Sequence, residues 1–419
     1  MAAADKYHFK KAHLPTQEEI QEYEDVMERF PRVPQRAKLW TPWFTIGVVI
    51  IAVGFLTLLA RFIFGLGAVT NLSNGFPWGL WITFDVVIGI ALASGGYTTA
   101  ALVYVFNDAR FSPLIRPAIT TALLGYAMAG FGVFIDVGRW WQIYNPLLPS
   151  MWHGGSALFE VSICVMAYLS VLVIEYIPTL TDRFIQGNKP AAARRAMNFR
   201  RWLDKFMILF ILTGIVISTL HQSSLGAIML LAPERLNALW YSPWLPAFFL
   251  LSSIAVGWHV VIVESIMSAK SFGRRIEMPL LAGLAKRTII FLGLYVIVKF
   301  YDLIFYDEFG LLFQSWYGLL WFAEVALFGI IPSWLLATPW VRRDPKLLFW
   351  TSWMVIAGLM LSRADVFLFA FKARPGWNYF PSLGEFVISA MMVSIIMVGY
   401  KVLANFFPVL NREETLARA

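Results

Sequence analysis

Long runs of apolar residues recur along nearly the whole chain, separated by shorter polar segments. The runs reach or exceed about 20 residues, the length at which an α-helix crosses the hydrocarbon core of a bilayer. The pattern predicts an all-α integral membrane protein with ten transmembrane helices, at residues 42–64, 77–105, 113–136, 152–180, 203–222, 243–269, 286–307, 313–338, 347–371 and 381–407.

Polar segments flank this membrane domain. Residues 16–19 form a capping-box pattern, and apolar residues follow at helical spacing as far as Pro31. This pattern predicts a short amphipathic helix. Since no apolar run and small-residue cleavage site follow the charged start directly, we expect no cleaved signal peptide. The predicted organisation is an N-terminal segment, a ten-helix membrane domain and a tail, at 1–41, 42–407 and 408–419.

The basic residues predict the orientation. With the predicted spans, 27 of the 34 lysine and arginine residues fall on one side, together with both termini and a loop at 181–205. Because basic residues concentrate in cytoplasmic loops, we expect both termini in the cytoplasm and a multi-pass protein of the bacterial or archaeal inner membrane. The net charge of +8 is then a sign of topology and indicates no nucleic-acid partner.

Composition narrows the possible cofactors. Cys164 is the only cysteine, which excludes an intrachain disulfide, a CxxCH haem attachment and a cysteine-ligated iron–sulfur cluster. A di-haem cytochrome b needs four axial histidines, whereas only three of the five histidines lie near the membrane: His153, His221 and His259. We therefore expect no haem and no metal site, with any iron–sulfur cluster held by a partner.

Weak echoes relate two halves of the membrane domain. Gly96-Tyr97 echoes Gly257-Trp258, and Phe159-Glu160-Val161 echoes Ala323-Glu324-Val325. The predicted helices two to five and six to nine start on the same side. The fold expected is thus a parallel repeat of two four-helix bundles, about 77–222 and 243–371, flanked by the first and tenth helices.

Titratable residues inside predicted spans point to function, because a charged side chain in the bilayer is costly and usually faces the bundle interior. Lys299 and Asp302 are spaced for a local ion pair, and so are Asp136 and Arg139. Glu160 and Glu264 have no obvious local partner and could carry protons. Asp85 lies on the second predicted helix, and Glu264 is nearer the cytoplasm. Seven of these groups fall in the outer half of the membrane: Asp136, Glu160, His221, Asp302, Arg363, Asp365 and Glu385.

Two further motifs lie at the outer helix ends. His221-Gln222-Ser223-Ser224 could hydrogen-bond a ligand carbonyl, or it could cap its helix. Asn74 to Trp81 brings Pro77 and Trp78 to the start of the second helix, as an aromatic belt or as the wall of a binding site.

Taken in order, these motifs resemble the NrfD/PsrC family of polysulfide-reductase-type membrane subunits. Within it the chain is most similar to the HybB-like subunit of respiratory nickel–iron hydrogenases, and the DsrP-like membrane subunit is a close second. The matching stretches are Asn74 to Asp85 (NGFPWGLWITFD), Gly125-Tyr126, Ile135 to Trp141 (IDVGRWW), Leu158 to Glu160, His221 to Gly226 (HQSSLG), Glu264, Arg363, Tyr379 to Pro381 and Glu385.

The resemblance implies a haem-free module that binds menaquinone or ubiquinone near the outer face. Its partners would be a periplasmic four-cluster ferredoxin-like iron–sulfur subunit, catalytic subunits such as a nickel–iron hydrogenase, and membrane lipids. By resemblance the quinone-binding residues are Tyr126, His221, Asp136, Arg139 and Trp78. Proton transfer falls to Glu160, Glu264 and Asp85, and Arg363 would stabilise anionic charge on the reduced quinone, as Arg139 would.

Other interpretations of the sequence stay open. The same module could serve a sulfite-reduction-associated or polysulfide-reductase-type complex. A secondary transporter of another class also fits ten helices, a repeat and acidic residues within spans. A purely structural anchor has no need for so many carboxyl groups in the membrane.

Overall fold

The computed structural model describes residues 32–187, 189–373 and 375–411. Within these ranges ten helices are long and apolar enough to cross a membrane, which confirms the predicted all-α membrane fold. Their bounds are Pro42–Phe64, Trp81–Val105, Ala109–Asp136, Ala157–Ile185, Pro190–Leu231, Leu245–Phe272, Met278–Phe305, Trp316–Ala337, Pro345–Phe369 and Leu383–Phe406. The amphipathic helix predicted before Pro31 and most of the predicted tail lie outside the described residues.

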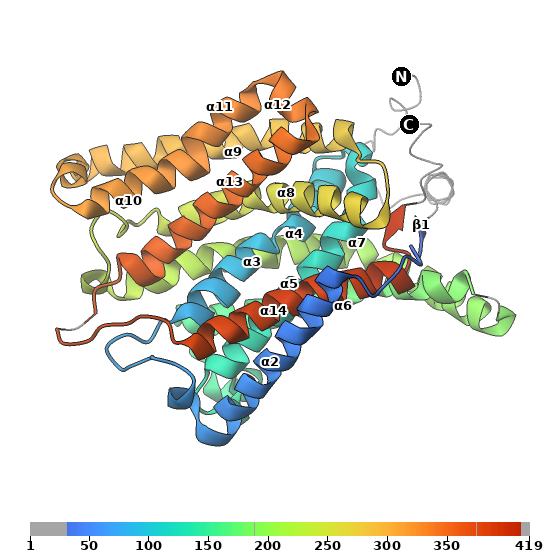
Figure 1. Ribbon diagram of the computed structural model, residues 1–419, viewed down its shortest axis with the longest axis horizontal. Coiled ribbons are helices and arrows are strands. Elements are labelled where there is room, and N and C mark those ends of the chain that lie inside the picture. Colours follow the sequence, from blue (N-terminus) through green and yellow to red (C-terminus); the bar gives the residue numbers. More distant parts are fainter. Residues whose placement is uncertain (1–31, 188, 374, 412–419) are drawn as a thin grey trace.

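Seven spans are built around one long α-helix each (Figure 1). These helices are α2 (Pro42–Phe64), α5 (Ser112–Asp136), α6 (Ala157–Ile185), α7 (Pro190–Ala227), α8 (Leu245–Phe272), α9 (Met278–Phe305) and α14 (Leu383–Phe406).

Three spans contain π-helical segments, which often mark functional sites. The second span joins η3 (Trp81–Ile88), α3 (Gly89–Leu92), α4 (Gly95–Ala100) and η4 (Ala101–Val105). The eighth joins α10 (Trp316–Val325), η12 (Ala326–Ile330) and α11 (Ile331–Ala337), and the ninth joins α13 (Pro345–Ala364) to η13 (Asp365–Phe369). The remaining short elements are β1 (Arg32–Val33), η2 (Leu66–Ala68), η5 (Ala109–Phe111), η6 (Trp140–Gln142), η7 (Asn145–Leu147), η8 (Pro149–Met151), η9 (Ile228–Leu231), η10 (Pro233–Arg235), η11 (Phe309–Phe313), α12 (Pro339–Arg343) and β2 (Leu410–Asn411).

Local sequence signals explain where several helices begin. Thr41 caps α2 ahead of Pro42, whose missing N–H group costs nothing in the first turn. Ser382 and Glu385 form a reciprocal capping box at the start of α14. Asp344 accepts hydrogen bonds from two backbone N–H groups at the start of α13.

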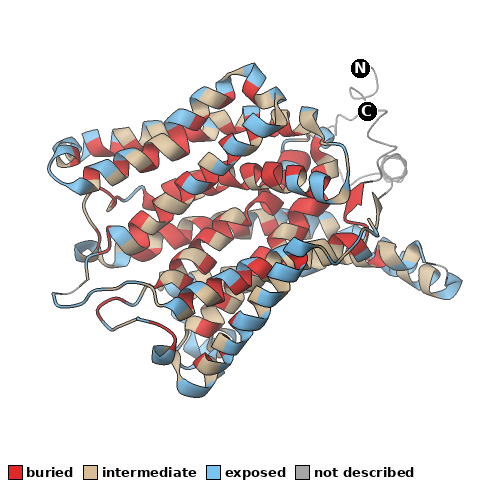
Figure 2. Cartoon of the chain, in the orientation of Figure 1, coloured by how far each residue is buried: buried red, intermediate tan, exposed pale blue. Residues whose placement is uncertain are grey.

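The helices pack into two neighbouring groups. The second span, α5, α6 and α7 contact one another; α8 and α9 pack with the eighth and ninth spans; and α7 and α4 contact α8 between the groups. The flanking helices α2 and α14 pack together beside α5, and the α9 to α12 region lies on the other side of the molecule (Figure 1). Buried residues concentrate on the inward faces of the helices (Figure 2). The internal repeat stays a prediction.

Glycines allow the two groups to approach closely. A Cβ atom at Gly95 would lie 2.9 Å from the carbonyl oxygen of Gly257. Within the first group, a Cβ atom at Gly96 would lie 2.7 Å from the Cβ atom of Ala122 on α5. Small residues at helix contacts in membranes serve this purpose.

One end of the bundle, which we name the termini end, carries β1 and β2 (Figure 1). The two strands pair antiparallel, Arg32 with Asn411 and Val33 with Leu410. The opposite end, named the far end, carries the loop 137–156 and the segment before α14. The sequence did not reveal this strand pair, because two-residue strands carry no periodic signal.

The predicted loop at 181–205 is wrong. Helix α6 continues to Ile185 and α7 begins at Pro190, so both helices extend beyond the predicted spans at the termini end. Ion pairs stabilise this extension: Arg200 lies 2.9 Å from Asp204 one turn on, and 2.8 Å from Asp182 on α6. Hydropathy alone assigns such a charged helical segment to a loop.

Candidate functional site

Polar side chains from α5 and α7 meet in the interior of the first helix group. The hydroxyl of Tyr126 lies 2.7 Å from Nε2 of His221, 3.4 Å from Oγ of Ser218 and 3.5 Å from Nε2 of Gln222. All four residues are fully buried. The ring of Tyr168, on α6, packs edge-on against Tyr126 with 4.6 Å between the centroids. We name these five residues the Tyr126–His221 cluster.

Helical spacing on α7 explains how three of these groups share one face. Ser218, His221 and Gln222 stand at positions i, i+3 and i+4, which project to the same side of an α-helix. Leu225, at i+7, is also buried and continues the stripe. The sequence of α7 therefore places a polar patch on its inward face.

Hydrogen bonds fix the tautomer of His221. Its Nδ1 lies 3.0 Å from the carbonyl oxygen of Ile217, which can only accept, so Nδ1 carries the proton. Nε2 then accepts from the Tyr126 hydroxyl. Gln222 donates through Nε2 to the carbonyl oxygen of Ile90, 3.1 Å away, whereas its buried Oε1 has no hydrogen-bond partner among the described residues. The cluster thus offers this buried oxygen as an acceptor for a ligand.

Glu160 reaches the same helix from the far end. Its carboxylate accepts a hydrogen bond from the hydroxyl of Ser224, one turn beyond His221. Glu160 is itself exposed on the surface of the chain. A carboxyl group therefore stands between the buried cluster and the far-end surface.

Glu264 lies deeper, towards the termini end. Its Oε2 accepts a hydrogen bond of 2.7 Å from Thr121, which precedes Tyr126 on α5. Its Oε1 is buried without a hydrogen-bond partner in the described ranges. Thr121 and Tyr126 are five residues apart on α5, which corresponds to a rise of about 7.5 Å. Glu264 and the Tyr126–His221 cluster therefore contact α5 at different depths.

A second polar group lies at the far end around Glu385. The Tyr379 hydroxyl donates to Oε1 of Glu385 at 2.5 Å and accepts from the backbone N–H of Leu80 at 2.7 Å. Burial and the neighbouring Glu385 carboxylate raise the pKa of Tyr379. The Trp81 indole donates to the Glu385 carbonyl at 3.2 Å. These contacts tie α14 to the start of the second span.

Two predicted quinone-site residues, Asp136 and Trp78, lie near this far-end group. Asp136 interacts electrostatically with Arg61 and Glu385, while Oδ1 of Asp136 has no hydrogen-bond partner in the described part of the chain. The ring of Trp78 lies edge-on to that of Phe367, with centroids 6.2 Å apart.

The predicted ion pair between Asp136 and Arg139 is wrong, since no ion pair of the described residues joins them. Helix α5 ends at Asp136 and the backbone of Val137 is extended, so the one-turn spacing that the pair needs is absent. Arg139 is exposed at the far end. Arg61 instead approaches from α2, where its guanidinium donates to the carbonyl oxygen of Val137 at 2.7 Å.

Asp85 lies in the π-helical η3 and faces α14. Its Oδ2 accepts a hydrogen bond of 2.6 Å from the hydroxyl of Ser389. Asp85 therefore does not share a hydrogen bond with Glu160 or Glu264, the other predicted proton carriers.

A third polar group occupies the second helix group. Glu324 accepts from the hydroxyl of Tyr295 at 2.5 Å and from the indole N–H of Trp240 at 2.8 Å, and its Oε1 lies 3.0 Å from Nζ of Lys299. We name these four residues the Glu324 cluster. Asp365 is buried nearby and interacts electrostatically with Glu324.

The predicted ion pair between Lys299 and Asp302 is also wrong. Lys299 pairs with Glu324 on the neighbouring α10, and Asp302 accepts a hydrogen bond of 2.6 Å from Ser242. An ion pair across two packed helices satisfies both buried groups, which sequence spacing along one helix does not reveal.

Arg363 belongs to this second helix group rather than to the Tyr126–His221 cluster. Its guanidinium lies 3.6 Å from the centre of the Phe249 ring and donates to Ser252 at 2.8 Å. Nε and Nη1 of this buried side chain have no hydrogen-bond partner within the described residues.

Comparison with known proteins identifies the family. Residues 68–375 match the family described as "Polysulphide reductase, NrfD". The chain belongs to the NrfD family. It is 34% identical over 365 residues to the "Probable Ni/Fe-hydrogenase 2 b-type cytochrome subunit" of Escherichia coli, covering 86% of this chain and 90% of that protein. It is 29% identical over 426 residues to the "Menaquinone reductase, integral membrane subunit" of Nitratidesulfovibrio vulgaris, covering 93% and 97%. The resemblance stated from the motifs is thereby confirmed.

The two buried histidines among the described residues, His221 and His259, are hydrogen-bonded to protein groups. Both ring nitrogens of His221 are hydrogen-bonded. Nδ1 of His259 lies 2.9 Å from the hydroxyl of Ser352, and His153 is in an exposed loop. In the described ranges no three His, Cys, Asp or Glu side chains are grouped so that they could hold a metal ion.

Sequence reasoning about the NrfD-family chain singled out Gln222 with His221 but missed two members of the Tyr126–His221 cluster, Ser218 and Tyr168. The spacing of Ser218, three residues before His221 on a predicted helix, was a signal that could have found it. Tyr168 carried no comparable signal, because a lone aromatic residue in an apolar span is indistinguishable from packing.

Proposed function

We propose that this NrfD-family chain is the quinone-binding membrane subunit of a respiratory redox complex. It would exchange electrons between iron–sulfur clusters of a partner subunit and the menaquinone or ubiquinone pool, with coupled proton transfer. The observation that carries the proposal is the Tyr126–His221 cluster, a fully buried set of donors and acceptors in the membrane interior. The Nitratidesulfovibrio relative is named as a menaquinone reductase membrane subunit, which supports the choice of substrate.

The cluster has the groups that quinone chemistry requires. A quinone presents two carbonyl acceptors, whereas a quinol presents two hydroxyl donors. Tyr126 can turn its hydroxyl from His221 to a quinone carbonyl, and the buried Oε1 of Gln222 can accept from a quinol hydroxyl. His221 can take a proton on Nε2 because its Nδ1–H is held by Ile217. Both redox states of the substrate would thus find partners.

Glu160, Glu264 and Asp85 are the proposed proton carriers. Glu160 is exposed and bonded to Ser224 one turn from His221, so it offers a route to the far end. Glu264 is half-buried and bonded to Thr121, on the other side of the cluster along α5. Asp85 would transfer protons near the Glu385 group, because its carboxylate accepts a hydrogen bond from Ser389 of α14.

The remaining predicted residues would act around the cluster. Asp136 and Trp78 would form the far-end entrance, with Arg139 at the surface. Arg363 would stabilise negative charge from the second helix group, where two of its nitrogens have no hydrogen-bond partner among the described residues. These assignments rest on the family resemblance and, for Arg363, on the burial of its side chain.

The proposed complex places the termini end in the cytoplasm and the far end in the periplasm of the inner membrane. A periplasmic four-cluster ferredoxin-like subunit would dock at the far end, nearest Glu160 and Tyr379. The Escherichia coli relative is named as a hydrogenase subunit, which favours a nickel–iron hydrogenase as the catalytic partner. A relative from Mesobacillus selenatarsenatis, at 23% identity, is named as part of a selenate reductase, so a reductase partner is the alternative.

The subunit is proposed to work without haem. The Escherichia coli relative is named a b-type cytochrome subunit, yet a bis-histidine haem needs two imidazoles that face one another with free nitrogens. Here both nitrogens of His221 and one nitrogen of His259 are hydrogen-bonded to protein groups. These contacts favour a role in which the two histidines orient neighbouring hydroxyl groups rather than bind haem iron.

The interrupted helices favour a redox subunit over a secondary transporter. Transporters of that class break corresponding helices in their two halves. Here the second span is irregular, whereas α8, the first span of the second half, is one continuous helix.

The experiment is purification from native membranes in mild detergent, with mass spectrometry of the co-purifying chains and a quinone assay of the eluate. Recovery of an iron–sulfur subunit with bound quinone and a nickel–iron hydrogenase is the expected result. A different catalytic subunit would change only the partner. Recovery of the chain alone, without quinone, would contradict the proposal.

A further inference from the structure

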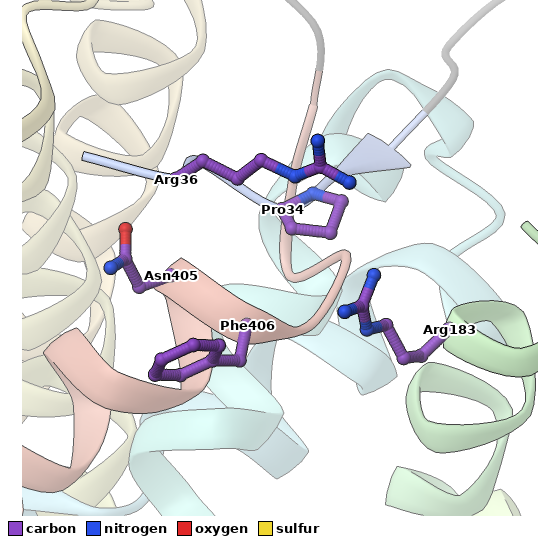
Figure 3. Close-up of a pocket in the computed structure, with 5 residues that line it drawn as sticks. All are labelled: Pro34, Arg36, Arg183, Asn405 and Phe406. Carbon is purple, nitrogen blue, oxygen red and sulfur yellow. The ribbon is translucent and has the colours of Figure 1, made fainter. Parts of the chain in front are cut away.

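A small cavity opens at the termini end, at the junction of three segments that are far apart in sequence. It has a volume of about 360 Å³ and is lined by Pro34, Arg36, Arg183, Asn405 and Phe406. Arg183 is in the last turn of α6, and Asn405 and Phe406 end α14. In Figure 3 the Arg36 side chain runs past Pro34, and the Arg183 guanidinium rises towards the cavity from the other side of Pro34.

Hydrogen bonds hold the cavity walls in place. Asn405 bonds both polar groups of Ala37: the Ala37 N–H donates to its Oδ1 at 2.6 Å, and its Nδ2 donates to the Ala37 carbonyl at 3.0 Å. Gln35 donates through its backbone N–H to the Ala404 carbonyl at 3.1 Å. Gln186, directly after α6, donates to the Arg32 carbonyl at 2.9 Å. The cavity is therefore formed before any ligand enters.

The two arginines carry positive charge that no acidic side chain of the described residues neutralises. No ion pair within these ranges includes Arg36 or Arg183. Asp182, next to Arg183 in sequence, is already bonded to Arg116 at 2.5 Å and to Arg200 at 2.8 Å. The cavity thus has a net positive charge.

The backbone of Arg36 is in the left-handed region, with φ of 49°. This conformation is uncommon for a residue with a Cβ atom. The hydrogen bonds of Ala37 and Gln35 on either side maintain it. The strained position turns the Arg36 side chain to the cavity (Figure 3).

The cavity lies where helices leave the membrane. Phe406 is the last residue of the span formed by α14 and is 48% exposed, and Phe184, one residue after Arg183, is 57% exposed. Exposed aromatic residues at the ends of spans lie at the level of lipid headgroups. A ligand in the cavity would therefore have apolar surface beside it as well as two guanidinium groups.

We propose that this cavity binds the phosphate of an anionic phospholipid headgroup, with Arg36 and Arg183 as the phosphate ligands. Guanidinium groups form charge-assisted, frequently bidentate hydrogen bonds with phosphate oxygens. The exposed rings of Phe406 and Phe184 contact the acyl region of the same lipid. The lipid would join the N-terminal segment, α6 and α14 at the membrane surface. This site is independent of the quinone site.

The test measures lipid binding to the purified full chain by native mass spectrometry, with phosphatidylglycerol as the probe. Each basic residue near a membrane surface contributes about fivefold to the binding of an anionic lipid, so Arg36→Gln with Arg183→Gln should weaken binding about 25-fold. The matched control is Arg194→Gln with Arg195→Gln, which removes two arginines from α7 outside the cavity. Because these two arginines lie outside the cavity, the control should weaken binding less than the Arg36→Gln, Arg183→Gln pair does.

Further measurements distinguish a lipid phosphate from free phosphate, and further variants control for misfolding. Inorganic phosphate at millimolar concentration should not displace the lipid, and displacement would overturn the assignment to a lipid. Equal weakening by the pocket pair and the control pair would also overturn it. The variants Arg36→Lys with Arg183→Lys keep the charge but lose bidentate geometry, so their affinity should lie between wild type and the glutamine pair. A wild-type affinity in the folded single variants Arg36→Gln and Arg183→Gln would likewise contradict the site.

Discussion

Replacing Tyr126 by phenylalanine removes one oxygen atom from the centre of the proposed quinone site. Among the described residues the hydroxyl is the only donor to Nε2 of His221, at 2.7 Å, and its other contacts, at 3.4 and 3.5 Å, are weaker. Leaving one buried acceptor unpaired costs about 1–3 kcal/mol in soluble proteins, and hydrogen bonds within membranes average nearer about 0.6 kcal/mol. We expect the Tyr126→Phe chain to be destabilised by about 1 kcal/mol, so that it still assembles.

The effect on turnover should be much larger than the effect on stability. A positioned acid or base contributes about 10²- to 10⁴-fold to a reaction with proton transfer. We therefore expect kcat for reduction of a menaquinone analogue by the purified complex to fall at least about 100-fold. The steady-state assay should be run beside a thermal unfolding measurement on the same preparation.

Tyr295→Phe is the matched control. Tyr295 is equally buried and donates to Glu324 at 2.5 Å, so the same atom is lost from a hydrogen bond outside the proposed quinone site. It should lower the thermal stability while the KM for quinone stays unchanged. The reasoning is refuted if Tyr126→Phe assembles and retains wild-type kcat and KM.

Four further outcomes are expected. Glu160→Gln, which keeps the size of the side chain but removes its titratable proton, should abolish quinone turnover while the subunits still co-purify; wild-type rates would exclude it from the proton route. Glu324→Gln should destabilise the chain by about 3–5 kcal/mol because Lys299 is left charged and buried. Adding Lys299→Met to this variant should restore part of the thermal stability. If the two substitutions instead lower the stability additively, the ion pair does not contribute as described. Asp108 is bonded to Arg110 and Arg287 at 2.7 and 2.5 Å, and the Arg110 hydrogen bond, with both cations, holds its pKa below the ordinary value of 3.8. The ion pairs of Asp108 therefore stabilise the fold above pH 3.8, and this stabilisation is lost as the pH falls through the lowered pKa. Asp108→Asn should flatten the loss of thermal stability below about pH 4. An unchanged dependence of thermal stability on pH would show that the Asp108 pKa is not linked to folding. The absorption spectrum of the purified chain should show no Soret band, and a stoichiometric haem would overturn the haem-free proposal.

Much of the fold was predictable because the bilayer imposes a minimum length on every apolar helix. The spans at 42–64 and 381–407, for example, coincide with α2 and α14 to within two residues. The extension of α7 to Pro190 was missed, since Arg200, Asp204 and their neighbours form a helix outside the apolar region. The strands β1 and β2 were also missed, because a strand of two residues is too short to show an alternation of apolar and polar residues.

The candidate site was predictable only in part, and the reason is tertiary. Tyr126 and His221 were named from the family resemblance, and their 2.7 Å contact could not be inferred from residues 95 positions apart. Ion pairs were assigned along one helix, whereas Lys299 pairs with Glu324 across two helices. In a membrane interior a buried charge takes its partner from whichever helix packs beside it, so local spacing is a poor guide.

The most direct test of the central claim is photolabelling of the native complex with an azido-naphthoquinone, followed by peptide mass spectrometry. The quinone site proposed here predicts labelled peptides from α5, α6 and α7, around Tyr126, Tyr168 and His221, and loss of the label when excess menaquinone analogue is present. Labels confined to peptides of the Glu324 cluster, around Trp240 and Tyr295, would place the quinone in the second helix group and contradict the account.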